Sequence, residues 1–413
     1  MPTPAEDTLD LTITGVAHGG VFVARHEGRV VFVSDAIPGE RVRARLTDTS
    51  KKSFWRAETV EVLESSEHRR PHVWEAADIA HAPEHRPGGA DFGHIDLTHQ
   101  RALKADVLAD ALRRFGGIDR TVDVRAVEGE TDGLRWRTRV SLHVDDAGNV
   151  GPYAARSHRV IPVQEYPLAT LPIERAAEKL FAGRGDRIDL VQPADGRVRV
   201  VNRRAEQNPR EQHEVIIETV GGREFQVDAD GFWQVHRAAA TTLDAAIRRL
   251  LGGERIDPDA WHLDLYGGVG LFGATVADLG GSRITSVEAD ARATEHAGEN
   301  LSEWVGARAE TARVDRYLRS LVQGASAREK ERLAQGVVVL DPPRTGAGRG
   351  VVTDLAALSP GTIVYVACDP VALARDLGTF RELGYAADQI EAFDLFPHSH
   401  HLETVALLHR ADG

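Results

Sequence analysis

The first part of the chain alternates hydrophobic and polar residues in short runs that are separated by turn residues. Gly19-Gly20 and Pro38-Gly39 each stand between two such runs. Alternation with a period of two over four to eight residues is typical of half-buried strands. The pattern predicts five strands, within residues 10–14, 21–24, 30–33, 41–46 and 59–63. Five short strands in about sixty residues indicate a small barrel of the oligonucleotide-binding (OB) type, which we expect at residues 8–67.

The pattern becomes mixed over residues 68–222. Leu97 to Phe115 repeats apolar residues at helical spacing and predicts an amphipathic helix, which we expect to pack on the C-terminal domain. Strand-like segments at 137–144 and 214–220 alternate with turns. We expect an α+β middle domain here, and we find no catalytic motif in it.

From residue 223 onward, largely apolar strand-like runs alternate with helical segments. These runs are residues 261–265, 284–287, 337–340, 363–367 and 404–408. Strands that are apolar on both faces are typical of parallel sheets covered by helices. We therefore predict a doubly wound, Rossmann-like α/β domain at residues 223–413.

Composition and charge narrow the functions that this chain can have. Its 413 residues suggest two or three domains, and its contents of 42% hydrophobic and 27% charged residues are ordinary for globular proteins. A formal net charge of −13 argues against a general nucleic-acid coat. Residues 41–56 are an exception, because they carry six Arg and Lys residues, one acid, and the aromatic pair Phe54 and Trp55. Cations beside aromatic rings suit single-stranded RNA, although a solvated strand edge with core aromatics explains the same pattern.

The chain contains one cysteine, Cys368, so it forms no internal disulfide and has no multi-cysteine metal or iron–sulfur site. Two groups of histidines invite a metal interpretation, but neither spacing fits a strong template, and we expect no metal. They are His81, His85, His94 and His99, and then His398, His400 and His401. The sequence shows no secretory leader and no membrane-length apolar run, so we expect a cytoplasmic protein and no membrane partner.

A glycine-rich loop follows the first strand of the C-terminal domain. Gly268, Gly270 and Gly273 fit G-x-G-x-x-G, and Glu288 comes 20 residues after the first of them. The motif fits NAD and also S-adenosylmethionine (SAM), because both bring backbone close to the cofactor and a carboxylate to a ribose. Asp264, at the end of the strand, favours SAM, since a carboxylate suits a cationic amino acid and repels a pyrophosphate. A tight turn without a ligand is the third interpretation.

Three more candidates lie at the ends of predicted strands. Asp341 opens Asp-Pro-Pro-Arg, Cys368 follows an apolar strand, and Glu403 precedes the last strand. The carboxyl ends of parallel strands line the ligand crevice of a doubly wound sheet, so these side chains are expected to meet there. A thiolate can act as a nucleophile and a carboxylate as a general base. Gln234, before a predicted helix, could bind a cofactor or a base edge.

Together these residues resemble the RNA (uracil-5-)-methyltransferase family, which makes 5-methyluridine in tRNA and 23S rRNA. The resemblance covers nearly the whole chain, and the N-terminal barrel is similar to the family's TRAM domain. The phrases that carry it are Gly15-Val-Ala-His-Gly-Gly, Ala36-Ile-Pro-Gly-Glu-Arg-Val, Phe232-Trp-Gln-Val-His, Asp264-Leu-Tyr-Gly-Gly-Val-Gly, Asp341-Pro-Pro-Arg, Cys368-Asp-Pro-Val-Ala-Leu-Ala-Arg-Asp and Phe396-Pro-His-Ser-His-His-Leu-Glu.

The resemblance implies a reaction and a role for six residues. Cys368 adds to carbon 6 of a uracil, carbon 5 then takes the methyl group of SAM, and Glu403 removes the carbon-5 proton. The SAM contacts that the resemblance implies are Gln234, Tyr266, Glu288 and Asp341. The expected partner is tRNA or 23S rRNA, and the protein is expected to act as a monomer.

The chain departs from the family at several positions. Many members carry four iron–sulfur cysteines before the first long helix, and this chain has none there. Asp369 and Leu271 each replace a family asparagine, and Arg313 stands at a cofactor contact that we do not carry over. The charge of Asp369 beside Cys368 should raise the pKa of the thiol unless a cation compensates. Two alternatives remain, an NAD-dependent oxidoreductase and an RNA-binding homologue with weak catalysis.

Overall fold

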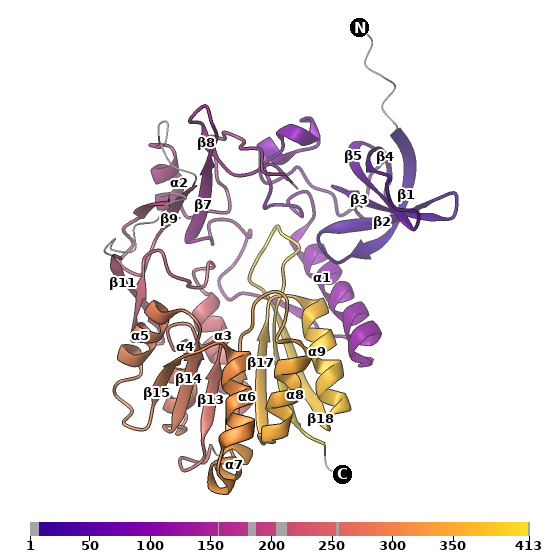
Figure 1. Ribbon diagram of the computed structural model, residues 1–413. Helices are drawn as coiled ribbons and strands as arrows, with labels where there is room; N and C mark the ends of the chain where they lie inside the picture. The colour runs from indigo at the N-terminus through magenta and orange to yellow at the C-terminus, as the bar shows by residue number, and fades with distance from the viewer. Residues whose placement is uncertain (1–7, 156, 181–186, 204–212, 253–255, 412–413) are drawn as a thin grey trace.

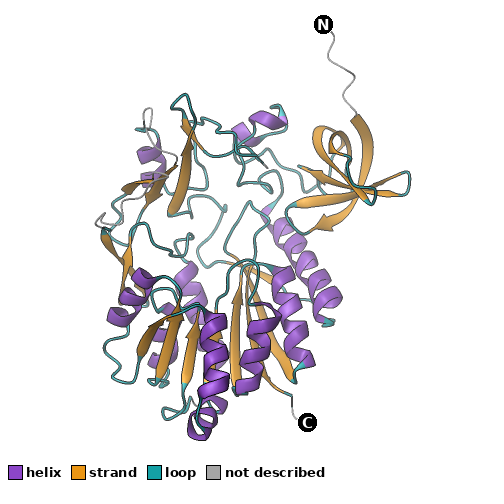
Figure 2. Cartoon of the chain, viewed as in Figure 1, coloured by secondary structure: helices purple, strands orange, loops and turns teal. Residues whose placement is uncertain are grey.

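The computed structural model describes residues 8–155, 157–180, 187–203, 213–252 and 256–411. Figure 1 shows a small barrel beside a larger body, whose lower half is a sheet flanked by helices. Figure 2 separates the strands of that sheet from the helices on its two faces. Within the described ranges, no helix combines the length and the apolar character needed to cross a membrane.

Five strands close the N-terminal barrel in the order β1-β2-β3-β5-β4. They are β1 (Thr8–Ala17), β2 (Val21–His26), β3 (Arg29–Ser34), β4 (Arg41–Asp48) and β5 (Phe54–Glu64). Alternate residues of each strand point inward and form a hydrophobic core that includes Leu11, Phe22 and Val33. The predicted OB-like barrel is therefore confirmed.

The segment after the barrel leads into a long helix that belongs spatially to the C-terminal half. It contains the short turns η1 (Glu75–Ala77) and η2 (Pro83–His85), and then α1 (Leu97–Ala111), which widens into η3 (Leu112–Gly116). Asp96 caps α1 by accepting hydrogen bonds from the backbone N–H groups of Thr98 and His99. The predicted stripe packs against α9, and a buried ion pair between Lys104 and Asp394 at 2.5 Å ties the helix to the sheet.

The middle of the chain forms two small sheets and one short helix. The first sheet has the order β10-β9-β7-β8, and the second is the hairpin of β11 and β12. These elements are β7 (Arg139–Val144), β8 (Val150–Gly151), α2 (Leu171–Ala177), β9 (Arg187–Val191), β10 (Arg199–Arg203), β11 (Val215–Val220) and β12 (Arg223–Asp228).

An eight-stranded sheet forms the centre of the C-terminal half, in the order β15-β14-β13-β16-β17-β19-β18-β6 among the described residues. Its strands are β6 (Val124–Ala126), β13 (His262–Leu265), β14 (Ile284–Glu288), β15 (Arg308–Thr311), β16 (Val337–Leu340), β17 (Thr362–Ala367), β18 (Tyr385–Asp394) and β19 (Glu403–Arg410). β13 to β17 are parallel, and β19 is antiparallel to both of its neighbours. The strand order reverses between β13 and β16, which is where doubly wound sheets bind ligands.

Helices cover both faces of this sheet. They are α3 (Ala239–Leu251), α4 (Leu271–Asp278), α5 (Ala291–Asn300), α6 (Val314–Gly324), α7 (Ala327–Ala334), α8 (Gly348–Leu358) and α9 (Pro370–Glu382). Neighbouring residues of one strand belong to opposite cores: Val339 packs with α3 and α4, and Val338 packs with α6 and α8. This alternation explains why the strands are apolar throughout, and it confirms the predicted Rossmann-like domain.

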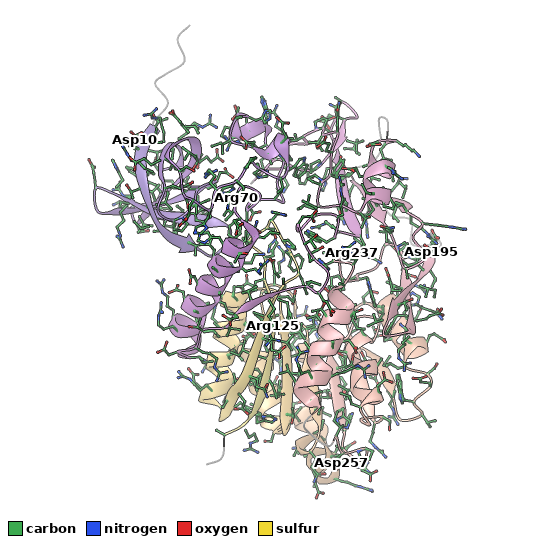
Figure 3. The ribbon with its side chains drawn as sticks, turned by 180° about the vertical axis from the view of Figure 1, so that it is seen from behind. Asp10, Arg70, Arg125, Asp195, Arg237 and Asp257 are labelled. Atoms are coloured by element: carbon green, nitrogen blue, oxygen red, sulfur yellow. The ribbon has the colours of Figure 1, made fainter. Side chains whose placement is uncertain are left out.

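The strand β6 extends this sheet from a segment that precedes the middle elements. It pairs in parallel with β18, with Arg125 opposite Phe393. Figure 3 shows Arg125 at the edge of the sheet beside α1, and its guanidinium lies 3.4 Å from the carboxylate of Glu391. We keep the division into residues 8–67, 68–222 and 223–413 as a proposal, in which α1, β6 and β11 are parts of the middle segment that pack on the C-terminal domain. The boundary at residue 222 falls in the turn between β11 and β12.

Candidate active site

All six residues singled out from the sequence line one cleft of about 1080 Å³ at the carboxyl edge of the sheet. They are Gln234, Tyr266, Glu288, Asp341, Cys368 and Glu403. Its size matches pockets that enclose a nucleoside-sized ligand. The expectation that strand ends bring Asp341, Cys368 and Glu403 to one crevice agrees with this lining, and the roles of all six residues are proposals.

The glycine-rich loop between β13 and α4 forms one wall of the cleft. Its backbone turns through positive φ angles at Tyr266 (60°), Gly268 (54°) and Gly270 (87°). A Cβ placed on Gly268 would meet no atom within 4 Å, so the backbone there faces open space. The Glu288 carboxylate holds the loop by accepting a hydrogen bond from the Gly268 N–H at 3.1 Å. Bare backbone beside a carboxylate fits the ribose of a bound nucleoside cofactor.

Asp264 has a different place from the one that the sequence suggested. Its side chain is buried and is not part of the cleft lining. One carboxylate oxygen accepts hydrogen bonds from the Ser286 hydroxyl at 2.9 Å and from the Gly273 N–H at 3.0 Å. Burial raises the pKa of Asp264 to about 6. This carboxylate therefore supports the glycine-rich loop from behind. The structure gives no support to the expectation that Asp264 contacts the cationic amino acid of SAM directly.

Strand register brings Cys368 and Glu403 together. β17 and β19 run antiparallel with Ala367 opposite Thr404, so the next residues toward the cleft are Cys368 on one strand and Glu403 on the other. Glu403 is buried, whereas Cys368 is partly exposed. A thiol and a buried carboxylate thus lie next to each other at the floor of the cleft.

Neighbouring charges set the protonation of this pair. Burial raises the pKa of Cys368 to about 12, and the carboxylates of Glu403, Asp341 and Asp369 act in the same direction. Burial and Asp341 hold the pKa of Glu403 well above its usual range. The Arg344 guanidinium opposes both effects by lowering the pKa of the thiol and that of the carboxyl. Arg344 is therefore the cation that stabilises the charged forms of both Cys368 and Glu403.

From the sequence, Arg344 stands in Asp-Pro-Pro-Arg without an assigned role, and His401 is considered only as a possible metal ligand. The two side chains meet at 3.4 Å between Arg344 Nη2 and His401 Nε2. Burial, together with His400 and Arg344, lowers the pKa of His401 to about 3. A neutral imidazole next to the guanidinium can accept a hydrogen bond, which orients Arg344 toward the cleft. The one sequence feature that could have pointed to Arg344 as a site residue is its positive charge directly after Asp341 and two prolines.

The phrase Ala374-Arg375-Asp376 has a structural explanation. The Asp376 carboxylate accepts hydrogen bonds from the Tyr365 hydroxyl at 2.6 Å and from the Ala347 N–H at 2.7 Å. It thereby fixes the start of α8 and the loop that follows Asp341.

Asp341 is itself perturbed, and this gives a prediction for stability. Burial and the nearby Asp264 raise the pKa of Asp341 from 3.8 to about 7. The folded chain then binds more protons than the unfolded chain between these values, so this group lowers the free energy of unfolding as the pH rises through them. Asp341→Asn should be more stable than the parent by about 4 kcal/mol at pH 8 and by less than about 1 kcal/mol at pH 4. Urea denaturation at both pH values measures this, and a difference independent of pH would contradict it.

Three arginines of the predicted basic stretch, Arg41, Arg43 and Arg45, form ion pairs with acids. Arg43 forms ion pairs with Asp10 at 3.0 Å and with Glu61 at 2.6 Å, and Arg45 pairs with Glu84 at 3.0 Å. Acids from neighbouring strands therefore offset charge that looks unopposed in the sequence. The aromatic pair is partly used by the barrel, since the Arg29 guanidinium lies 4.2 Å from the Trp55 ring centre. Lys51, Lys52 and Arg56 are exposed at the end of this stretch.

Several histidines that invited a metal interpretation have other partners. His81 pairs with Glu75, His94 contacts the Ala36 carbonyl oxygen, and His99 stacks on His68 at 3.8 Å. His398 contacts Gln100, and His400 contacts Asp91.

The fold and the cleft define a Rossmann-like, cofactor-binding type of domain joined to a five-stranded OB-like barrel. Two family models match the chain, the TRAM domain over residues 6–57 and tRNA (Uracil-5-)-methyltransferase over residues 319–411. An uncharacterized RNA methyltransferase of Streptomyces avermitilis is 37% identical over 98% of this chain and 99% of the relative. Another from Bifidobacterium longum is 35% identical over 97% and 96%. The chain belongs to the SAM-dependent RNA (uracil-5-)-methyltransferase family, with a TRAM domain at its N-terminus.

A solved structure agrees with this fold. The tRNA (uracil-54, C5)-methyltransferase of Pyrococcus abyssi, crystallised with S-adenosyl-L-homocysteine, superimposes with a TM-score of 0.68 and 21% identity, covering 96% of this chain and 99% of that one. Family membership also decides between the two cofactor interpretations of the glycine-rich loop, in favour of SAM over NAD.

Proposed function

We propose that this chain transfers a methyl group from SAM to carbon 5 of a uridine in tRNA or 23S rRNA, through a covalent bond between Cys368 and carbon 6 of the base. The observation that carries the proposal is that the register of β17 and β19 puts the Cys368 thiol and the Glu403 carboxyl side by side in the lining of the cleft. An NAD-dependent oxidoreductase would leave the N-terminal barrel and the Asp341-Pro-Pro-Arg loop unexplained. Retention of Cys368 and Glu403 also argues against a homologue with weak catalysis.

The cleft residues divide into those that hold the cofactor and those that act on the base. Glu288 and the glycine-rich loop suit the ribose, and Gln234, Tyr266 and Asp341 line the remaining wall. When bound, SAM supplies an electrophilic methyl group. Asp341 lines the same cleft as Cys368, and we place it where the methyl group and the uracil would meet.

The protein side chains carry the other steps. The thiolate of Cys368 forms a bond with carbon 6, and the displaced electron pair makes carbon 5 nucleophilic. Once carbon 5 holds the methyl group, Glu403 takes the carbon-5 proton, the double bond re-forms and the bond to sulfur breaks. The raised pKa of Glu403 makes its carboxylate a stronger base for this proton. Arg344 favours the thiolate that begins the sequence.

The RNA must reach this cleft with its target uridine unstacked, as enzymes that act on a base require. On the barrel, the exposed Lys51, Lys52 and Arg56 are the cations that suit phosphate contacts best, because the neighbouring arginines are paired with acids. We propose these three residues, rather than the whole basic stretch, as the RNA contact of the barrel.

Changing Lys51, Lys52 and Arg56 together to glutamine should weaken RNA binding. The slope of log affinity against log salt concentration should fall by about 2, as expected when three phosphate contacts are lost. The matched control changes Arg41, Arg43 and Arg45 to glutamine and should leave the slope nearly unchanged. Titration at several salt concentrations measures both variants, and equal slopes for the two triple variants would assign RNA binding elsewhere.

The function itself is tested with purified protein, SAM carrying a deuterated methyl group, and RNA from cells that lack the protein. Mass spectrometry of the nucleosides should find labelled 5-methyluridine in either tRNA or 23S rRNA, and sequencing of the labelled fragments should give one position. Label in any other nucleoside, or in none, would reject the proposal. We further propose a monomer in the reducing cytoplasm, where Cys368 stays a thiol.

A further inference from the structure

The turn between β1 and β2 of the barrel reaches the loop that carries Cys368. His18 lies in this turn, and its Nε2 atom is 2.7 Å from Oδ2 of Asp369, the residue that follows the cysteine. His18, Cys368 and Asp369 also line a second cavity of about 160 Å³. It shares Arg344, Cys368 and His401 with the lining of the larger cleft. A residue of the barrel therefore contacts the neighbour of the nucleophile across 351 positions of the sequence.

A close fit holds this turn in place. Gly20 has a φ of +72°, and a Cβ on it would lie 2.6 Å from Oδ2 of Asp91 and 2.9 Å from Nδ1 of His400. These two side chains are hydrogen-bonded to each other, with 2.5 Å between His400 Nδ1 and Asp91 Oδ2. Only a glycine with this backbone conformation brings the turn so close to the pair. His18 thus has a defined position on the catalytic domain.

Asp369 divides its two oxygens between two tasks. Oδ1 caps α9 by accepting hydrogen bonds from the N–H groups of Val371 at 3.0 Å and Ala372 at 2.8 Å. Oδ2 pairs with His18. An asparagine oxygen could cap the helix equally well, so the negative charge is not needed for the cap. That charge does act on Cys368, because it raises the pKa of the thiol.

We propose that His18 is a positioning residue of the methyl transfer, which pairs with Asp369 from the barrel and offsets the negative charge beside Cys368. This inference rests on the proposed function, in which Cys368 is the nucleophile. It makes the docked barrel a part of the active site, because a barrel moved away from the catalytic domain would leave the Asp369 charge unopposed. The sequence contained both residues but gave no sign that they meet.

The surroundings of His18 support a charged imidazole. Its hydrogen bond to Asp369 raises the pKa of His18, while Arg375 on α9 opposes this. The other charged or titratable side chains around the cavity are Lys104, Arg344, His400 and His401. The His18 side chain is 45% exposed, so solvent and salt screen the pair, and a moderate effect is expected.

The single cysteine gives a direct measurement that does not depend on methyl transfer. The rate of alkylation by iodoacetamide, followed against pH at low salt, reports the thiolate fraction of Cys368 alone. The set of proteins is the parent, His18→Ala, Asp369→Asn, the double variant, and His26→Ala as a histidine control on the same barrel. Thermal unfolding confirms that each variant is folded.

His18→Ala should slow alkylation at pH 7.5 by about threefold, equal to a rise of about half a unit in the pKa of the thiol. Asp369→Asn should speed it, and in that background the His18 substitution should change nothing. The first difference should shrink in 1 M salt, and His26→Ala should match the parent. Equal rates for His18→Ala and the parent, or an equal slowing in both backgrounds, would overturn the proposal. Methylation by a Cys368→Ala variant would instead overturn the proposed function on which it rests.

Discussion

Cys368→Ala is expected to abolish methyl transfer, with a loss of more than about a thousandfold in rate. Carbon 5 of uracil is a poor nucleophile until a bond forms at carbon 6, and Cys368 is the one cysteine that the chain possesses. Its position at the floor of the cleft, next to Glu403, leaves it in reach of a base there. The measurement is incorporation of a labelled methyl group into RNA under single-turnover conditions.

The control for this variant is cofactor binding. Calorimetry with SAM should give nearly the same affinity for the variant as for the parent, because the cofactor wall of the cleft is built from other residues. A loss of methyl transfer with intact SAM binding separates chemistry from folding. Activity within tenfold of the parent would show that no covalent bond to sulfur is needed.

Glu403→Gln is expected to slow turnover by about a hundredfold or more while the covalent bond to RNA still forms. An amide of the same shape cannot take the carbon-5 proton, so the enzyme should stop after methyl transfer with the base attached to Cys368. Denaturing gels should then show a protein–RNA adduct with ordinary uridine RNA, and mass spectrometry should find a methyl group on the bound base.

A matched control for this variant is Glu382→Gln, which changes an exposed carboxylate of α9 outside the cleft lining. It should turn over like the parent and show no adduct. If Glu403→Gln also turned over normally, another group would have to accept the proton. Absence of both turnover and adduct would place Glu403 before bond formation, which contradicts its role as the base.

The strands that were predicted from the sequence are those with a strong apolar pattern. β16 and β17 are buried over their whole length, and their hydrophobic runs are unambiguous. β15 and β6 were not predicted, because they are short edge strands with mostly exposed residues. β18 was missed as well, since its polar residues around Asp388 and Gln389 are exposed and a bulge interrupts its pairing there.

The site likewise contains residues that could be predicted from the sequence and residues that could not. Cys368 and Glu403 could be predicted because each lies at the end of a strand, and the topology of the sheet brings strand ends together. The place of Asp264 could not be derived, because a strand-end carboxylate can face the ligand or support the loop from behind. The contact of His18 with Asp369 depends on how the barrel docks, which no local pattern contains.

The most direct test of a covalent mechanism uses RNA in which 5-fluorouridine replaces uridine. Fluorine at carbon 5 cannot be removed as a proton, so the reaction should stop with the base bound to the enzyme. After digestion, tandem mass spectrometry should find methylated 5-fluorouridine attached to the peptide that contains Cys368, and only when SAM is present. Methylated RNA without any such peptide, or the nucleotide attached to another residue, would contradict the central role of Cys368.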